Sequence, residues 1–340
     1  MSRVAEPVGH DAIRAMLRGL AVARAGGSSA VLHHAWLFAG PAGVGKYQVA
    51  RWWASLLKCS ALGACEPVCD SCRLAAGAVH PDIFETGPAP KEKNVVVTAD
   101  AVIERKKSVG VDESRGVIQR LALRPVRPGP RVAIVREAGT MTPEAQNALL
   151  KLLEEPPGSA VIILVTDNIG AMLPTVRSRC RHLAFGALSD DEVAEVLRRL
   201  GKDDEEARAA AACSRGSVAR ALGYDADGLA QREALLLMYE GARRDPSTIE
   251  ALVGAMATRK DDGYALGDLL EWQMAKVETS LGRRASEPSE KLARVLDAAA
   301  ALEPRALVGD ADLIQRTIDA IARNAQPKLA IRDMLLNVKA

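Results

Sequence analysis

The sequence lacks any apolar run long enough to cross a membrane. A membrane-spanning helix needs about 20 mainly apolar residues, and an uninterrupted apolar stretch such as Ala160–Val165 is far shorter. The N-terminal residues, Met-Ser-Arg-Val-Ala-Glu, also lack the apolar core of a secretory signal peptide. These absences predict a cytoplasmic protein that makes no contact with a membrane.

An excess of either charge is also absent, and aromatic residues are scarce. The 340 residues include 45 Lys and Arg against 43 Asp and Glu, a net charge of +2, and 3% are Phe, Trp or Tyr. This balance provides no general electrostatic surface for nucleic acid, so any contact with DNA would be local. The length is sufficient for two or three domains with well-formed cores.

A glycine-rich stretch, WLFAGPAGVGKYQVA, is the most informative part of the chain. It predicts a strand at 35–39, a turn, and a helix that begins near Lys46. Four residues lie in a phosphate-binding loop of the form G-x-x-x-x-G-K: Gly40, Gly43, Gly45 and Lys46. In such a loop, backbone N–H groups hold phosphate oxygens and the lysine adds a positive charge. The loop indicates either binding of ATP or ADP, or a turn retained only for packing the strand on the helix.

Two positions that should hold a magnesium ion are altered. A working loop has Ser or Thr after the lysine, and its hydroxyl ligates Mg²⁺; here that residue is Tyr47. After the second strand, expected at 131–135, an ATPase has adjacent acidic residues for the metal and the attacking water. This chain has Arg136-Glu137 instead. We therefore expect neither Mg²⁺ binding nor ATP hydrolysis by this chain.

Four of the six cysteines are clustered with the spacing C-x5-C-x3-C-x2-C: Cys59, Cys65, Cys69 and Cys72. Four thiolates suit a tetrahedral Zn²⁺ ion, and such a closed site is structural because no position is left for water. Disulfides are the alternative, which a reducing cytosol disfavours, and free thiols are another. Cys180 and Cys213 stand alone and are expected to be small buried apolar side chains.

The remaining pattern of the first half predicts an α/β fold. Short apolar strands alternate with amphipathic helices, as in a parallel sheet covered on both faces. Besides the elements around the loop, we expect a strand at 161–165 and helices at 11–24, from an Asp112 cap to about 123, and from a Thr142 cap to Pro156. Polar segments at 26–29 and 91–94 are expected to be a link and a loop. His33 and His34 should point to opposite faces, one packed and one exposed.

The second half is expected to be entirely helical. Helices at 189–200, 204–213 and 216–222 would form a small lid, and about five longer helices would follow from Gln231. We expect three domains: an α/β domain at 1–186 with a zinc module at about 59–72, a three-helix lid at 187–228, and a helical domain at 229–340. The last could pack against other subunits or form a self-contained bundle.

Two motifs together indicate a family. The runs NALLKLLEEPP (147–157) and LPTVRSRC (173–180) resemble those of the clamp-loader ATPases of bacterial DNA polymerase III holoenzyme. The resemblance extends to residues 34–38, the cysteine cluster, His80-Pro81-Asp82 and residues 324–336. It implies an α/β P-loop domain of the AAA+ class with an inserted zinc module, a helical lid and a helical collar. It also implies a part in loading the sliding clamp onto primer-template DNA during replication.

The departures from the family pattern resemble its stationary delta-prime branch. The gamma/tau branch keeps Thr after the lysine and an Asp-Glu pair, and its lid carries a nucleotide-sensing Arg where this chain has Ala219. The chain is also too short for tau's C-terminal extension. The resemblance implies gamma/tau and delta subunits as partners in a hetero-oligomeric ring. The alternative is an ATP-hydrolysing motor of the same superfamily that tolerates Tyr47 and Arg136.

Arg179 has two interpretations. Arg177, Arg179 and Arg181 alternate along the chain, which is typical of the solvated face of a strand. The family resemblance instead implies that Arg179 is an arginine finger, which acts in trans on the γ-phosphate of a neighbouring subunit's ATP. It leaves Arg177 and Arg181 as surface charges.

Overall fold

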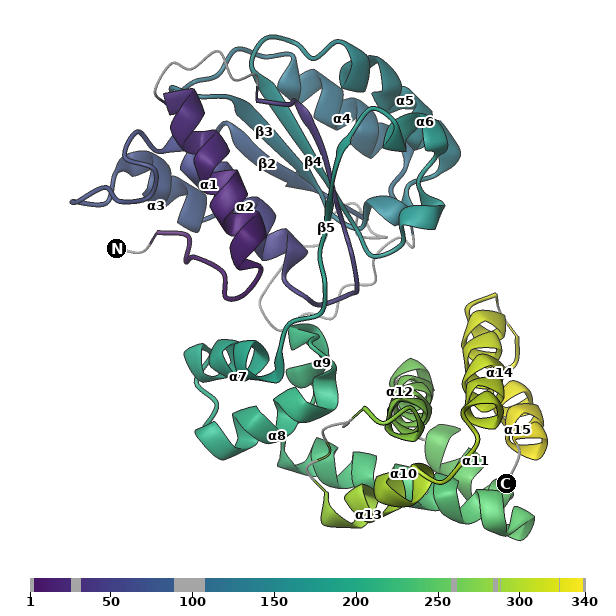
Figure 1. Ribbon diagram of the computed structural model, residues 1–340. Coiled ribbons are helices and arrows are strands. Elements are labelled where there is room, and N and C mark those ends of the chain that lie inside the picture. Colours follow the sequence, from purple (N-terminus) through teal and green to yellow (C-terminus); the bar gives the residue numbers. More distant parts are fainter. Residues whose placement is uncertain are drawn as a thin grey trace. The chain divides into compact units, whose positions relative to one another are not determined.

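The computed structural model describes residues 3–25, 32–88, 108–257, 262–283, 287, 289–323 and 325–338 (Figure 1). The predicted link at 26–29 and loop at 91–94 lie outside this part of the chain. The contacts divide into two compact units: Met1–Val196 with Arg215–Ala219, and Leu197–Ser214 with Arg220–Ala340. The three domains expected from the sequence stay a prediction.

The first unit is built on a parallel five-stranded sheet with the strand order β2-β3-β4-β1-β5. The strands are β1 (Ala35–Ala39), β2 (Ile83–Thr86), β3 (Arg131–Val135), β4 (Ala160–Thr166) and β5 (Arg181–Ala184). The three central strands are those predicted from the sequence, because burial on both faces makes them almost wholly apolar. The edge strands β2 and β5 were not predicted as strands, since each is four residues long and partly exposed.

Helices cover both faces of this sheet, as the sequence predicted (Figure 1). One face is covered by α1 (Asp11–Ala25) and α2 (Lys46–Lys58), with α3 (Asp70–Ala76) packed against α2. The other face is covered by α4 (Val111–Leu121), α5 (Pro143–Glu154) and α6 (Pro174–Arg177). Short 3-10 helices, η1 (Ala138–Thr140) and η2 (Ile169–Ala171), follow β3 and β4. The phosphate loop follows the carboxyl end of β1 and Arg136 follows that of β3, so these two parts of the candidate site lie at the same edge of the parallel sheet. The four cysteines and Arg179 lie in segments that lead into the amino ends of β2 and β5.

Three local predictions can be compared with the structure. Thr142 caps α5 as expected, because its hydroxyl accepts a hydrogen bond from the Ala145 N–H. The prediction for Asp112 is wrong: α4 is capped at Gly110, whose N–H donates to the Glu113 carboxylate, and the helix ends at Leu121.

The prediction for the paired histidines is also wrong. His33 and His34 are both half-buried, and their rings stack with centroids 4.9 Å apart. They lie before β1 begins, so the alternation of side chains along a strand does not apply to them. One nitrogen of each ring lies at hydrogen-bond distance from a backbone carbonyl: Nδ1 of His33 from that of Ala35, and Nε2 of His34 from that of Leu153.

Beyond β5 the described chain is helical, as expected. The helices are α7 (Asp190–Arg199), α8 (Asp204–Ser214), α9 (Val218–Ala221), α10 (Ala226–Arg244), η3 (Pro246–Thr248), α11 (Ile249–Ala257), α12 (Asp262–Ser280), α13 (Glu290–Ala299), α14 (Pro304–Ala322) and α15 (Pro327–Asn337). The helix expected at 216–222 is shorter, because Arg215 and Gly216 both have positive φ. The core of the second unit surrounds the buried Trp272 and Tyr239.

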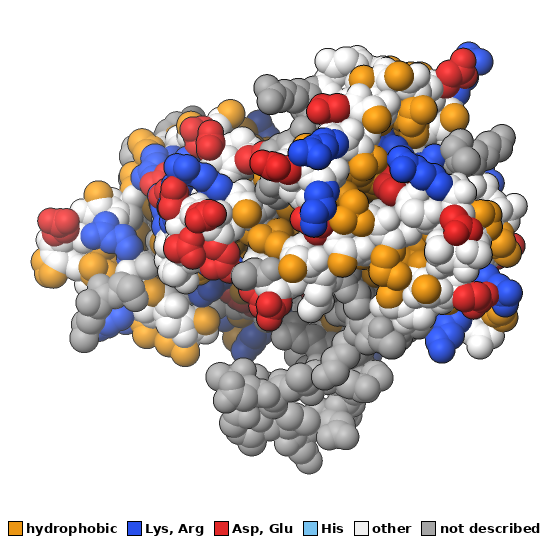
Figure 2. Space-filling view, turned by 90° about the horizontal axis from the view of Figure 1, so that it is seen from below, with side chains coloured by type: hydrophobic (Ala, Val, Ile, Leu, Met, Phe, Trp, Pro, Cys, Tyr) orange, Lys and Arg blue, Asp and Glu red, His pale blue; other side chains and the backbone are white. Residues whose placement is uncertain are grey.

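The surface carries mixed charges. Figure 2 shows Lys and Arg interspersed with Asp and Glu on the face drawn there, together with apolar side chains. Within the described residues, no helix combines the length and the apolar character that are needed to span a bilayer.

Candidate functional site

The phosphate-binding loop lies between β1 and α2, as the sequence predicted. Gly40, Gly43 and Gly45 all have positive φ, a conformation that residues with a Cβ rarely adopt. Lys46 is 6% exposed, and its Nζ donates to the carbonyl of Gly40 at 2.7 Å and to that of Pro41. Burial lowers the pKa of Lys46, while the nearby charge of Asp167 opposes this shift. The lysine is thus held by the loop's own carbonyl groups.

Neighbouring segments of the first unit pack closely on this loop. The Val218 N–H donates to the carbonyl of Gly43 at 2.9 Å, and His10 Nε2 lies 2.8 Å from the carbonyl of Val44. A Cβ at Gly43 would lie 2.2 Å from Ser217 Oγ, so only glycine fits beneath the 215–219 segment. Ala219, at the expected sensing position, faces this same glycine.

Tyr47 reaches from the first turn of α2 toward the ends of β2 and β3. Its hydroxyl donates to the Glu85 carboxylate, and burial together with this carboxylate raises the pKa of Tyr47 to about 12. The guanidinium carbons of Arg51 and Arg136 lie 5.9 Å and 5.6 Å from the centre of its ring. A phenol, a carboxylate and two guanidinium groups therefore meet where the two halves of a magnesium site would converge.

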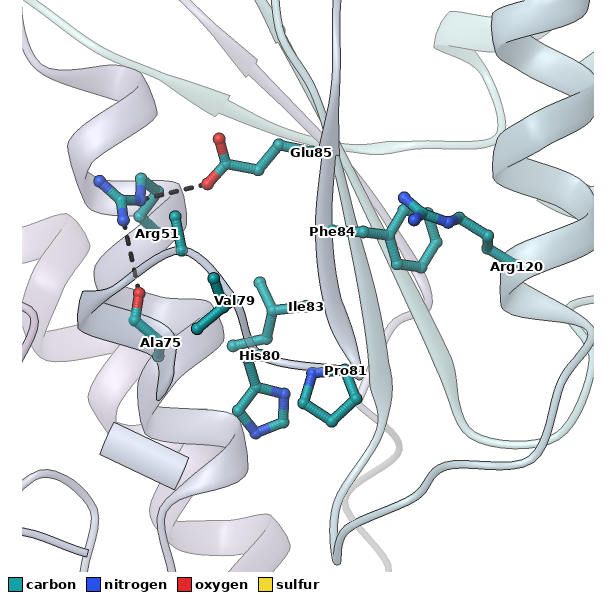
Figure 3. A pocket seen from close by; sticks show the side chains of 10 residues that line it. Arg51, Ala75, Val79, His80, Pro81, Ile83, Phe84, Glu85 and Arg120 are labelled. Carbon is teal, nitrogen blue, oxygen red and sulfur yellow. Dashed lines mark hydrogen bonds and ion pairs between the residues drawn. The ribbon is translucent and has the colours of Figure 1, made fainter. Parts of the chain in front are cut away.

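Figure 3 shows one side of this cluster. Arg51 lies between Glu85, with Nε 3.1 Å from a carboxylate oxygen, and the carbonyl of Ala75. The pocket drawn there is lined by Arg51, Ala75, Ala78, Val79, His80, Pro81, Ile83, Phe84, Glu85 and Arg120. None of its lining residues belongs to the phosphate loop, so the pocket is separate from the nucleotide motif. Sequence reasoning missed Glu85, because nothing in the local pattern links it to Tyr47. It also missed Arg51, although the spacing of four residues from Tyr47 on the same helix could have indicated this contact.

The four clustered cysteines converge as predicted. Their sulfur atoms all lie within 4.8 Å of one another, with 3.6 Å between Cys65 and Cys72 and 3.9 Å between Cys59 and Cys69. Sulfurs placed at about 2.3 Å from a central zinc ion lie about 3.8 Å apart. The four thiols are free, three of them are buried, and they can hold a zinc ion.

The environment of the cysteines favours thiolate formation at one of them. The Cys69 N–H donates to Cys65 Sγ, and this hydrogen bond is the chief reason why the pKa of Cys65 falls to about 7. Burial raises the pKa of Cys59 and Cys72. A divalent cation would supply the charge needed to ionise these buried thiols.

A buried ion pair joins the cysteine module to the sheet. Lys58 Nζ lies 2.9 Å from the Asp82 carboxylate, and both side chains are 0% exposed. Asp82 also accepts hydrogen bonds from the N–H groups of Val126 and Arg127. Sequence reasoning assigned no structural role to the His80-Pro81-Asp82 motif. Through Asp82, this motif ties the end of α2 to the loop at Val126 and Arg127.

Arg179 lies in the turn between α6 and β5. Its Nε donates to Glu154 Oε1 at 2.8 Å, its Nη2 lies 2.5 Å from the same oxygen, and its Nη1 donates to the Thr175 carbonyl at 2.9 Å. The interpretation of three alternating strand positions is wrong, because Arg177 ends α6 and only Arg181 lies in a strand.

The two flanking arginines have different surroundings. Arg181 is exposed, and its guanidinium lies 5.4 Å from the centre of the Trp36 ring. Arg177 is half-buried rather than a plain surface charge, since its Nε is enclosed and has no hydrogen-bond partner among the residues that the structure describes. Further along the chain, Arg220 pairs with Asp268 at 2.9 Å and with Glu271, so it is engaged within the second unit. Cys180 and Cys213 are buried, as predicted.

Comparison with known proteins identifies the family. A family model described as "DNA polymerase III, delta subunit" matches residues 25–189. The chain is 35% identical over 182 residues to DNA polymerase III subunit delta' of Pseudomonas aeruginosa, and the aligned region covers 49% of this chain and 51% of the relative. It is 28% identical over 344 residues to DNA polymerase III subunit tau of Salmonella typhimurium, and the aligned region covers 95% of this chain and 48% of the relative.

The chain thus spans about half the length of these two relatives. A solved structure of RuvB from Thermotoga maritima aligns with 88% of this chain and 85% of its own, at 16% identity and a TM-score of 0.42. The family match lies over the part of the chain that carries the phosphate loop, the four cysteines and Arg179. The chain belongs to the clamp-loader family of DNA polymerase III.

Proposed function

We propose that this chain is a non-hydrolysing, delta-prime-type subunit of a bacterial DNA polymerase III clamp loader. It acts in the cytoplasm, in a ring with gamma/tau and delta subunits. Through that complex it helps load the sliding clamp onto primer-template DNA. The observation that carries this proposal is the position of Tyr47. Its phenol donates a hydrogen bond to Glu85 at the place where a motor subunit would hold its metal.

The surroundings of Tyr47 support the absence of hydrolysis. Mg²⁺ is bound through oxygen ligands in an octahedral shell and keeps several waters. Here the position after Lys46 offers an aromatic ring in place of a short hydroxyl, and Arg51 and Arg136 place two positive charges beside it. These charges repel a divalent cation, and without it the charge on a transferring phosphoryl group is not neutralised. Any ATP or ADP in the loop would be held without catalysis.

Arg179 would supply the chain's chemical contribution. The transition state of phosphoryl transfer spreads negative charge over the γ-phosphate oxygens, and a guanidinium supplied in trans stabilises it. The half-exposed Arg179 side chain, carried on the turn before β5, is accessible to a neighbouring subunit. Support comes also from the family motif that contains it.

A structural zinc ion is part of the proposal. Cys59, Cys65, Cys69 and Cys72 would hold it, and the separations of their sulfurs fit a tetrahedral site. Such an ion would stabilise the segment between α2 and β2 and would take no part in turnover.

The test of the proposal is ATP hydrolysis by the purified chain. We expect no turnover above background with Mg²⁺ and ATP. In the reconstituted complex, Lys46→Ala should have little effect on clamp loading, because no catalysis depends on this lysine. The second candidate, a working motor subunit, is favoured by the intact glycine loop and Lys46. Turnover by the isolated chain that disappears with Lys46→Ala would establish that candidate instead.

A further inference from the structure

One edge of the Arg179 guanidinium is bound by residues that the structure describes, and the other is not. A guanidinium has five N–H groups, and the Nε–Nη2 edge of Arg179 faces a single oxygen of Glu154, while Nη1 donates to the Thr175 carbonyl. These contacts use three N–H groups. Within the described part of the chain, one N–H on each Nη is left without a partner, and these two form the outer edge of the fork. That edge can bind two phosphate oxygens at once.

The backbone beneath this side chain is fixed. The Arg179 N–H donates to the Val176 carbonyl at 3.2 Å and the Cys180 N–H to the Arg177 carbonyl at 3.3 Å. Val176 and Cys180, on either side of Arg179, are buried. The local backbone is therefore fixed by the turn itself, whereas the orientation of the long Arg179 side chain depends on the groups that its guanidinium contacts.

Glu154 is placed to set that orientation. It is the last residue of α5, directly after the buried Leu152 and Leu153, and it belongs to the LEEPP run of the family motif. Its carboxylate comes from a different element than Arg179, so it fixes the guanidinium relative to the first unit's core and not merely to the local turn.

We propose that Glu154 is a positioning residue for Arg179, holding the Nε–Nη2 edge so that the outer edge is presented to the neighbouring subunit's terminal phosphate. The inference rests on the proposed function of Arg179 in trans. An arginine side chain has many rotamers, and holding it in place before the reaction reduces the freedom lost in the transition state. Because Glu154 and Arg179 are 49% and 35% exposed, their ion pair contributes little to folding. An effect of Glu154 on turnover is therefore separable from an effect on stability.

The experiment uses the full chain reconstituted with gamma/tau and delta subunits, the clamp and primer-template DNA. The quantity measured is the Arg179-dependent ATP turnover, defined as the part that Arg179→Ala removes. We expect Glu154→Ala to lower it about fivefold, the size of coupling between two contacting side chains. The KM for ATP should stay unchanged, and Glu154→Gln, which keeps an acceptor oxygen, should lower the turnover less. The matched control is Glu155→Ala, since Glu155 is the exposed neighbour in the same motif.

A double mutant separates positioning from a general structural effect. If Glu154 acts through Arg179, adding Glu154→Ala to Arg179→Ala should cause no further loss. A further loss in that background, or a loss equal to that of Glu155→Ala, would overturn the inference. Full turnover with Glu154→Ala alone would overturn the inference but leave the proposed function intact. Full turnover with Arg179→Ala would overturn both.

Discussion

At the scale of single residues, the chain's differences from a motor subunit concentrate at Tyr47 and Arg136. The replacement of a short hydroxyl by a phenol is visible in the sequence. Only the structure shows that the phenol donates a hydrogen bond to Glu85 and that two guanidinium groups lie close to its ring. Because burial and Glu85 raise the pKa of Tyr47 to about 12, the phenol stays neutral at physiological pH and offers no phenolate oxygen to a metal.

Arg179 gives a prediction at this scale. Arg179→Ala should leave zinc content and ring assembly unchanged, since a half-exposed ion pair contributes little to stability. It should remove most of the turnover at the adjacent motor site, where an arginine finger is worth about 10³–10⁵ in rate. The whole complex would keep the turnover of its other sites. Arg179→Lys should rescue poorly, because an ammonium group does not reproduce the planar fork.

Steady-state ATP hydrolysis and clamp loading by the reconstituted complex measure this effect. Arg181→Ala is the matched control: it removes an exposed arginine two residues away that stacks on Trp36. A complex with Arg179→Ala that hydrolyses ATP and loads clamps at the unmodified rate would show that Arg179 is only a surface charge.

At the scale of elements, the segment between α2 and β2 has a small apolar core of its own. Its cluster of buried residues consists of Cys59, Cys65 and Cys72, with Val68 and Cys69 packed against it. The buried Lys58–Asp82 pair anchors its two ends. A segment with so few apolar contacts depends on other interactions for its order, and a zinc ion would provide them.

Removal of zinc is the prediction at this scale. Cys72→Ser should abolish binding of one Zn²⁺ per chain and lower the free energy of unfolding by on the order of 4 kcal/mol, because a metal tie is lost. Elemental analysis and urea unfolding with and without a chelator measure these effects. Cys180→Ala is the control: it removes a buried thiol outside the cluster and should leave zinc content and the chelator response unchanged. Native protein without zinc, or with a disulfide among the four, would contradict the prediction.

At the scale of the whole molecule, the chain consists of two units with separate cores. Chains with more than one domain need not unfold in a single step. The four cysteines lie in the first unit, whereas the second is stabilised by helix packing around Trp272 and by buried ion pairs such as Arg232–Glu287. Loss of a metal should therefore destabilise only the first unit.

The tryptophans allow this to be measured. Three of the four, Trp36, Trp52 and Trp53, lie in the first unit, and Trp272 alone lies in the second. In a Trp272→Phe variant, tryptophan fluorescence reports only on the first unit, and a chelator should shift its unfolding midpoint to lower denaturant concentration. Circular dichroism should also detect the unfolding of the second unit, and the midpoint of that second transition should not change with the chelator. A single transition that shifts as a whole would show that the two units unfold together.

The sequence by itself determined the features that depend on neighbouring residues. Glycines at 40, 43 and 45 with Lys46 specify the loop conformation, a continuous apolar run specifies a central strand, and four closely spaced cysteines converge because the chain between them is short. The edge strands β2 and β5 escaped prediction, because partial exposure weakens the apolar pattern that marks the central strands.

Only the tertiary structure decided which distant residues meet. Glu85 reaches Tyr47 because α2 packs against β3 and β4, and β2 lies beside β3 in the parallel sheet. Glu154 reaches Arg179 because α5 ends next to the turn before β5. These pairs are separated by 38 and 25 residues. Their contacts depend on strand order and helix packing, which are set by burial of the whole core and leave no trace in a local pattern.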